Sequence, residues 1–138
     1  MLISEMSAYR NRETLLTTTP DVTVRDAAQQ MTAKDYGAIL VTDAGGRIAG
    51  ILTERDLMKR IVARGLDPDA TPVSEAMTVS VKTATVDDDI ADCLGLMAGG
   101  RFRHLPVVDA EGRPQGMLSH RDFVALTWRD VAKRAAEQ

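Results

Sequence analysis

Two heptapeptides carry the residue types best suited to binding chemistry, Gly50-Ile-Leu-Thr53-Glu-Arg-Asp56 and Gly116-Met-Leu-Ser119-His-Arg-Asp122. In each, a predicted strand ends in two apolar residues after the glycine, and a helix is predicted to begin at the hydroxyl residue. The first turn of a helix leaves unpaired backbone N–H groups, which favour an anion. The aspartate three residues later has two carboxylate oxygens, which can accept two hydrogen bonds from a vicinal diol such as a ribose. The repeated motif therefore predicts a site for a ligand with an anionic group and a sugar.

The same motif has a second interpretation that needs no ligand. A hydroxyl residue followed three residues later by an acidic one can form a capping box, in which the side chains satisfy the helix's own N–H groups. Both copies use aspartate where a capping box more often uses glutamate, and both follow a glycine that permits close approach. These two features favour a ligand site, and the capping box stays open as the alternative.

The two motifs belong to a longer internal repeat. At an offset of 66 residues, positions 21–57 and 87–123 align without a gap and share 12 identical pairs among 37. Such a match indicates two copies of one folding unit. In each copy the patterns predict the order strand, helix, strand, strand, helix, which is an α/β fold of the α+β type. The predicted boundaries are 1–66 for the first unit with its N-terminal segment, 67–73 for the connector, and 74–138 for the second unit with its C-terminal helix.

Each predicted element has a counterpart in the other copy. The expected strands are 15–19, 38–42 and a third that ends at Leu52, matched by 79–83, 104–108 and a third that ends at Leu118. The apolar face of the first helix is Ala27, Ala28 and Met31 in one copy and Ile90, Cys93, Leu94 and Met97 in the other. The apolar residues of the closing helices are Leu57, Met58, Ile61 and Val62, and then Phe123, Val124, Leu126, Thr127, Trp128 and Val131. We expect Trp128 to lie in the core, with a dimer interface as the alternative.

Composition restricts the possible functions. The 138 residues have a net charge of −3, and the 17 Lys and Arg residues are dispersed among 20 acidic ones, so a nucleic-acid partner is not expected. One cysteine and two histidines cannot supply a structural zinc site, and Cys93 is expected to be a buried apolar side chain. No signal peptide or membrane-length apolar run can be recognised, so we expect a cytoplasmic protein without a membrane partner.

Catalytic residues are not predicted. His104 and His120 could each act as a general base, but the sequence shows no carboxylate dyad, activated Ser or Cys, or orienting third group at a fixed spacing. We therefore expect a binding protein and not an enzyme.

The doubled unit resembles a tandem pair of CBS domains, named for cystathionine β-synthase. The resemblance is carried by the repeated motif, by Leu105-Pro-Val-Val-Asp109 and by Ser74-Glu-Ala-Met77-Thr78, and it covers about residues 15–128. The first unit departs from it, because residues 11–19 lack the Met-Thr pair. The resemblance implies two units packed with pseudo-twofold symmetry and a homodimer formed through helices. It also implies a regulatory module that binds AMP, ADP or ATP, with or without magnesium, and signals to an effector protein not yet identified. Some members bind S-adenosylmethionine or a dinucleotide.

The resemblance also implies roles for individual residues. Asp56 and Asp122 would hold ribose hydroxyls, and Thr53 and Ser119 would contact ribose or phosphate. Backbone at 36–38 and 102–104 would line the purine, helped by residues 78–81 and 11–17. The complete set of predicted ligand-binding residues is Tyr36, Gly37, Ala38, Thr53, Arg55, Asp56, Thr78, Val81, Phe102, Arg103, His104, Ser119, His120, Arg121 and Asp122.

The two copies differ where the ligand is expected. Arg103-His104 stands where the first copy has Gly37-Ala38. In the nucleotide-sensing members that this segment resembles, basic residues just before the Leu-Pro-Val sequence contact phosphates. We therefore expect two unequal clefts, with phosphate binding dependent on Arg103 and His104; a solvated group of charges is the alternative. The rival for the whole chain is a structural dimerisation scaffold, in which the motifs only cap helices and the clefts stay empty.

Overall fold

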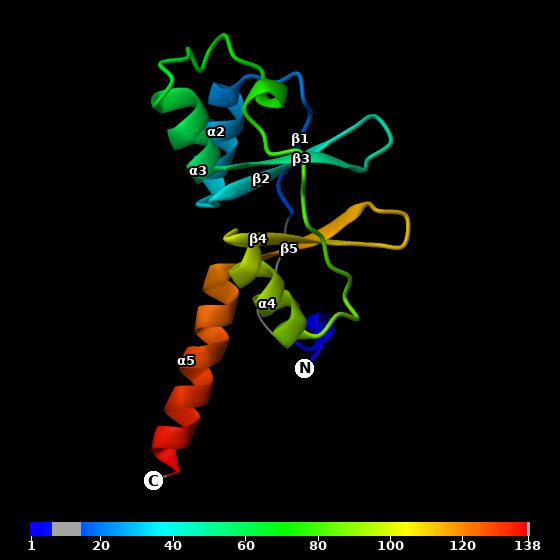
Figure 1. Ribbon diagram of the computed structural model, residues 1–138, viewed down its shortest axis with the longest axis vertical. Helices are drawn as coiled ribbons and strands as arrows, with labels where there is room; N and C mark the ends of the chain where they lie inside the picture. The colour runs from blue at the N-terminus through cyan, green and yellow to red at the C-terminus, as the bar shows by residue number, and fades with distance from the viewer. Residues whose placement is uncertain (7–14, 138) are drawn as a thin grey trace.

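The computed structural model describes residues 1–6 and 15–137 and contains two similar units, one above the other in Figure 1. After η1 (Ile3–Glu5), the first unit has β1 (Thr17–Thr18), α2 (Val24–Lys34), β2 (Ala38–Thr42), β3 (Ile48–Thr53), α3 (Glu54–Asp56) and η2 (Leu57–Val62). The second unit has η3 (Val73–Glu75), α4 (Ile90–Gly100), β4 (His104–Val108), β5 (Pro114–Ser119) and α5 (His120–Ala136). The predicted α+β fold with two tandem units is confirmed. Residues 11–14, which were expected to help line the purine, lie outside the described residues.

The sheets are built around two equivalent hairpins. β2 pairs with β3 antiparallel, β4 pairs with β5 antiparallel, and β1 adds to β2 in parallel. Asp43 Oδ1 accepts bonds from the N–H groups of Gly45 and Arg47, and Asp109 Oδ1 accepts the corresponding pair. Gly46 and Gly112 complete the turns with φ of 78° and 80°, which glycine adopts without strain. The predicted hairpins are therefore confirmed in both copies.

The strand predicted at 79–83 does not form. The described pairing there is a single parallel bridge between Ala84 and Val107. In the first unit, Leu40 N–H donates to Leu16 O over 3.1 Å and extends the ladder. The residue that corresponds to Leu40 is Pro106, which has no N–H, so the equivalent bond to residue 82 cannot be made.

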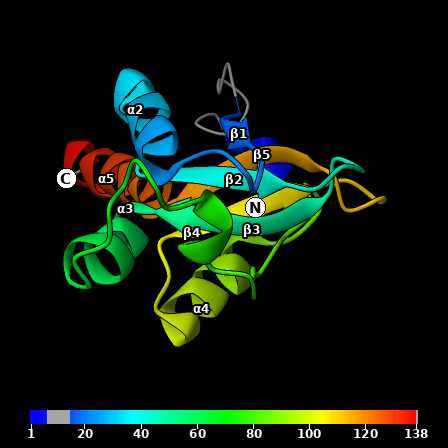
Figure 2. The same cartoon turned by 90° about the horizontal axis from the view of Figure 1, so that it is seen from above.

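The two sheets pack face to face. Ala38, Leu40 and Ile51 from the first unit form one buried cluster with Met117 from the second. At the hairpin tips, Arg47 Nε donates to Glu111 O over 3.0 Å, and Arg113 Nε donates to Gly45 O over 3.3 Å. These four residues correspond at the repeat offset of 66, so the two contacts are related by pseudo-twofold symmetry. Figure 2 shows the two hairpin tips on the same side of the molecule.

The helices differ from the sequence prediction in three places. The closing helix of the first unit is a short α-helix followed by a π-helix, with Met58 and Val62 exposed. Leu94, predicted on the buried face of α4, is 40% exposed, because the buried stripe of α4 holds only Ile90, Cys93 and Met97. Trp128, predicted in the core, is 68% exposed, because α5 runs on past the sheet of its unit (Figure 1).

Each unit is completed by a short helix from outside the repeat. Ile3 and Met6 of the η1 segment are buried in the core of the second unit, together with Phe123. Val73 and Ala76 of the η3 segment are buried in the core of the first unit. This packing crosses the domain boundaries drawn from the sequence, which place 1–6 with the first unit and 74–77 with the second.

Candidate functional site

Two clefts lie between the units, and each takes its binding motif from one unit and a loop from the other. The first, called here the Asp122 cleft, has a volume of about 620 Å³ and brings residues 119–122 together with residues 36–38. The second, called here the Asp56 cleft, has a volume of about 530 Å³ and brings residues 53–56 together with residues 100–104 and 80–82. Both volumes suit a small-molecule ligand.

All fifteen residues predicted to bind a ligand line one or both clefts. The Asp122 cleft contains Tyr36, Gly37, Ala38, Arg103, His104, Ser119, His120, Arg121 and Asp122. The Asp56 cleft contains Thr53, Arg55, Asp56, Thr78, Val81, Phe102, Arg103 and His104. The sequence therefore located the walls of both clefts, and the contact of each residue with a ligand stays a prediction.

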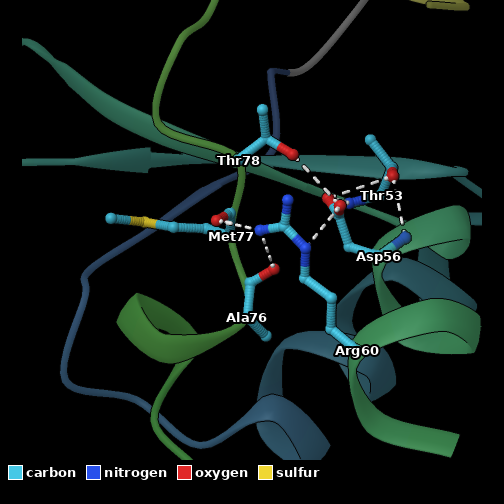
Figure 3. A network of polar contacts seen from close by, with 6 residues as sticks. All are labelled: Thr53, Asp56, Arg60, Ala76, Met77 and Thr78. Atoms are coloured by element: carbon cyan, nitrogen blue, oxygen red, sulfur yellow. Dashed lines mark hydrogen bonds and ion pairs between the residues drawn. The ribbon is translucent and has the colours of Figure 1, made fainter. Parts of the chain in front are cut away.

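The Asp56 carboxylate is 7% exposed and is held by a network of side chains (Figure 3). Its Oδ2 accepts bonds from the Thr53 N–H over 3.0 Å and the Thr53 hydroxyl over 3.1 Å. The Asp56 N–H in turn donates to Thr53 Oγ1 over 3.2 Å, which completes a capping box. The Thr78 hydroxyl donates to Oδ1 over 3.1 Å. The capping box, which was the alternative interpretation of the motif, therefore forms at the start of α3. It uses Asp56 Oδ2, whereas Oδ1 faces Thr78.

Arg60 lies one turn beyond Asp56, in the π-helix. Its Nη1 donates to the carbonyl oxygens of Ala76 over 3.1 Å and Met77 over 2.7 Å. Its Nε lies 3.8 Å from Asp56 Oδ1, an ion pair too long for a hydrogen bond. Arg60 therefore connects the motif of the first unit with the chain segment that leads into the second (Figure 3).

The second motif also forms a capping box at the start of its helix. The Ser119 N–H donates to Asp122 Oδ2 over 2.8 Å, and the Ser119 hydroxyl donates to the same oxygen over 3.3 Å. α5 thus begins with the same arrangement of hydroxyl and carboxylate as α3. Position 126, which corresponds to Arg60, is a partly buried leucine that cannot form the Arg60 contacts.

The two clefts meet at a shared wall of Glu54, Arg103 and His104, which line both. A Cβ on Gly37 would stand 3.1 Å from Glu54 Oε1 and 3.4 Å from His104 Nε2, so the carboxylate and the imidazole face the same small volume. Backbone bonds fix this region, since the N–H of Glu54 donates to Gly37 O over 3.0 Å and that of His120 donates to Arg103 O over 2.8 Å. The absence of a side chain at Gly37 leaves room for this wall.

Sequence reasoning missed several residues of the site. Glu54 corresponds to His120 at the repeat offset, and that correspondence could have identified it. Lys34 and Lys82 also line the clefts, but a single charged residue gives no signal that separates it from a solvated surface. Arg60 could not have been found, because its contacts are with backbone carbonyls that sequence spacing does not reveal.

The charges of the lining residues differ between the clefts. In the Asp56 cleft, the described residues supply four basic side chains, Arg55, Lys82, Arg101 and Arg103, and two acidic ones, Glu54 and Asp56. In the Asp122 cleft, they supply Lys34, Arg103 and Arg121 against Asp35, Glu54 and Asp122. The Asp56 cleft is therefore the more positive of the two among the described residues, although the chain carries a net charge of −3.

Two further observations concern metals and membranes. Over residues 1–6 and 15–137, no group of three or more His, Cys, Asp or Glu side chains is arranged to hold a metal ion. Within the same ranges, no helix combines the length and the apolar character needed to span a bilayer.

Two repeated units packed through their sheets, with a cleft formed by both units on either side, define a tandem-repeat module. The CBS domain family model matches residues 8–63 and 73–134, and the chain belongs to the CBS domain family as a tandem pair. The resemblance identified from the sequence is confirmed.

Similar proteins come from archaea, bacteria and the plant Arabidopsis thaliana. An uncharacterized 17.7 kDa protein of Acidianus ambivalens is 39% identical over 104 residues, which are 75% of this chain and 62% of that protein. The chain thus spans less than two thirds of the length of that relative. The crystal structure of a CBS-domain containing protein from Agrobacterium tumefaciens is 35% identical with a TM-score of 0.83, covering 92% of this chain and 99% of that one. A CBS domain protein from Pyrobaculum aerophilum, complexed with AMP, is 25% identical with a TM-score of 0.79, covering 88% and 89%.

Proposed function

We propose that this chain is a regulatory, non-enzymatic module that binds an adenine nucleotide in the clefts between its two units. The observation that carries the proposal is the composition of each cleft, which joins a buried or half-buried aspartate at a helix start with a loop from the opposite unit. The aspartates suit a ribose diol, and the basic side chains suit phosphate groups. The AMP complex of the Pyrobaculum protein supports adenosine monophosphate as the first ligand to test.

The clefts are proposed to be unequal. The excess of basic over acidic side chains among the described residues of the Asp56 cleft favours phosphorylated ligands there. Arg103 and His104 line both clefts, so they are proposed to contribute to phosphate binding in either one. AMP, ADP and ATP differ in the phosphate charge that these residues would neutralise, and magnesium would reduce that charge.

A ligand that contacts both units can act as a signal. Each cleft is lined by residues of both units. A ligand that binds one relative orientation of the two units more tightly than another therefore shifts the population of the chain towards that orientation. We propose that an effector protein or a second copy of the chain reads this orientation. The cytoplasmic location expected from the sequence stays a prediction.

Calorimetry against adenosine, AMP, ADP, ATP and S-adenosylmethionine tests the proposal, with Asp56→Ala and Asp122→Ala as cleft-specific variants. Each variant is expected to lose one binding event and keep the other. A ligand at 100 times its Kd should raise the free energy of unfolding by about 2.7 kcal/mol, which a thermal melt detects. Hydrolysis or transfer of a phosphate group by the chain would contradict the non-enzymatic assignment.

The second candidate function is a ligand-free dimerisation scaffold. It is favoured by the capping contacts at both helix starts, because Thr53 and Ser119 already bond to their aspartates. It also agrees with the exposed apolar residues of α5, Val124, Trp128 and Val131, which are spaced for one helix face. Absence of a thermal shift with every nucleotide, together with a concentration-dependent dimer, would favour the scaffold.

A further inference from the structure

Arg60 lies next to the Asp56 cleft without lining it. It is not one of the described residues that form the cleft wall, and its guanidinium faces the Asp56 carboxylate, with Nε 3.8 Å from Oδ1 (Figure 3). Its Nη1 is fixed by two backbone carbonyls, those of Ala76 and Met77. The guanidinium is therefore anchored independently of the carboxylate that it faces.

The ion pair with Arg60 does not take up a hydrogen-bond acceptor position of Asp56. A carboxylate oxygen can accept about two hydrogen bonds, and Oδ2 already accepts two from Thr53. Oδ1 accepts one from Thr78, while Arg60 Nε at 3.8 Å attracts Oδ1 without a hydrogen bond. Among the described residues, one acceptor position on Oδ1 is therefore left for a ligand. The Thr78 hydroxyl oxygen lies next to it and can accept a hydrogen bond from the second hydroxyl of a diol.

We propose that Arg60 is a positioning residue of the Asp56 cleft, which holds the Asp56 carboxylate and the 76–78 segment in the geometry that a ribose diol requires. The inference rests on the proposed function. Ribose recognition in the Asp56 cleft would then depend on the cation of Arg60. The corresponding position in the second unit is Leu126, which carries no charge. The Asp56 cleft is therefore the one with the sharper preference for a ligand with both ribose hydroxyls.

The test compares adenosine with 2′-deoxyadenosine, which differ only in the diol. Both are titrated by calorimetry into the full chain with Asp122→Ala, so that the Asp56 cleft is read alone. Arg60→Leu places in the first unit the residue that the second unit has at this position. Arg64→Leu removes the same charge from an exposed site on the following turn and serves as the matched control. Neither nucleoside carries a phosphate, so loss of general positive potential does not enter the comparison.

The expected result is a preference for adenosine over 2′-deoxyadenosine that falls about tenfold in Arg60→Leu, as for a lost charge-assisted contact, and is unchanged in Arg64→Leu. Arg60→Lys keeps a cation and is expected to restore part of the preference. If Arg60→Leu does not melt cooperatively, the preference for adenosine over 2′-deoxyadenosine is measured in Arg60→Lys instead.

Two outcomes would overturn the inference alone. One is an unchanged preference in both Arg60 variants, and the other is an equal loss of both nucleosides, which would mean that Arg60 only supports the fold. If neither nucleoside binds measurably, AMP and 2′-deoxy-AMP replace them in the same comparison. Failure of the chain with intact Asp56 and Arg60 to bind AMP as well would overturn the proposed function together with the inference.

Discussion

Ile51 of β3 and Thr78, which follows η3, exchange two backbone hydrogen bonds, with Ile51 N–H donating over 2.9 Å and Thr78 N–H over 2.8 Å. This antiparallel bridge places the start of the second unit against the sheet of the first. Gly50, next to Ile51, allows the close approach. A Cβ at Gly50 would stand 2.6 Å from Met77 Sδ and 2.8 Å from Thr78 O, so an added methyl group would push against backbone.

Gly50→Ala is therefore expected to lower the free energy of unfolding by about 1–3 kcal/mol, the range for overpacking a filled interior. Chemical denaturation measures it. Gly95→Ala is the matched control, because Gly95 lies inside α4 with nothing within 4 Å of its added Cβ. That change is expected to raise the free energy of unfolding by roughly 0.5–1 kcal/mol. Equal effects of the two substitutions would show that the bridge does not constrain Gly50.

Charge reversal at Arg103 tests the shared wall. Arg103→Glu is expected to weaken AMP binding in both clefts by at least about tenfold more than it weakens adenosine binding, because only AMP loses a charge-assisted contact. Calorimetry with both ligands gives the ratio. Lys133→Glu reverses the same charge at an exposed position of α5 and should leave the ratio unchanged. Equal losses for AMP and adenosine would mean that Arg103 does not contact phosphate.

Trp128 reports on association between copies. Val124, Trp128 and Val131 are 55%, 68% and 54% exposed on α5, and α5 lies towards the same side of the molecule as α3 in both views (Figures 1 and 2). We predict that this face packs against a second copy, and that Trp128→Glu weakens the dimer at least about tenfold by placing a charge in an apolar contact. Sedimentation velocity over a concentration series measures the change.

The fluorescence of Trp128 gives an independent readout, because it is the one tryptophan of the chain. Its emission should shift to shorter wavelength as the chain concentration rises, since association would remove the ring from water. Lys133→Glu, on the opposite side of the same helix from Val124, is the control. A monomer at all concentrations, with emission that does not move, would contradict the prediction.

Cys93 is expected to react slowly in the folded chain. It is buried in the core of the second unit, and burial raises the pKa of its thiol, with neighbouring carboxylates of Asp88, Asp92 and Asp89 adding to the effect. The reactive species is the thiolate, so alkylation by iodoacetamide at pH 8 should be at least about tenfold slower than in urea.

The sign of the pH effect follows from the raised pKa of Cys93. The folded chain holds the thiol proton more tightly than the unfolded chain, so this stabilisation is fully present below the ordinary thiol pKa and is lost as the pH rises from there through the raised pKa of the folded chain. Cys93→Ala, which copies Ala27 of the first unit, should abolish both the alkylation and this part of the pH dependence. Rapid alkylation of the native chain would show that the core around α4 opens readily.

The internal repeat made most of the fold predictable, because each helix, strand and turn pattern occurs in both copies. The strands 38–42 and 104–108 and the Asp-to-Gly hairpin turns followed from residue types and spacing. The walls of both clefts followed from the resemblance to CBS domains. The prediction that Trp128 lies in the core was wrong, because apolar periodicity identifies the apolar face of a helix but does not show whether the same chain buries that face. The π-helix at 57–62 also leaves no periodic signal over six residues.

A second repeat register was missed. Leu2-Ile3-Ser4-Glu5-Met6 matches Pro72-Val73-Ser74-Glu75-Ala76 at an offset of 70, not 66. Both stretches form short helices with a buried first residue, Ile3 or Val73. A search restricted to one offset cannot find this match, because the first unit has four more residues between the helix and its first strand.

The crossed placement of these two short helices has a consequence for how the chain comes apart. A fragment of residues 1–66 would lack Val73 and Ala76, and a fragment of residues 67–138 would lack Ile3 and Met6, so each half would be left with an open core. Neither half should fold alone, whereas a mixture of the two should reconstitute the native structure by complementation. For the same reason, the intact chain should melt in a single cooperative transition. A destabilising substitution in one half should lower the stability of the other half as well.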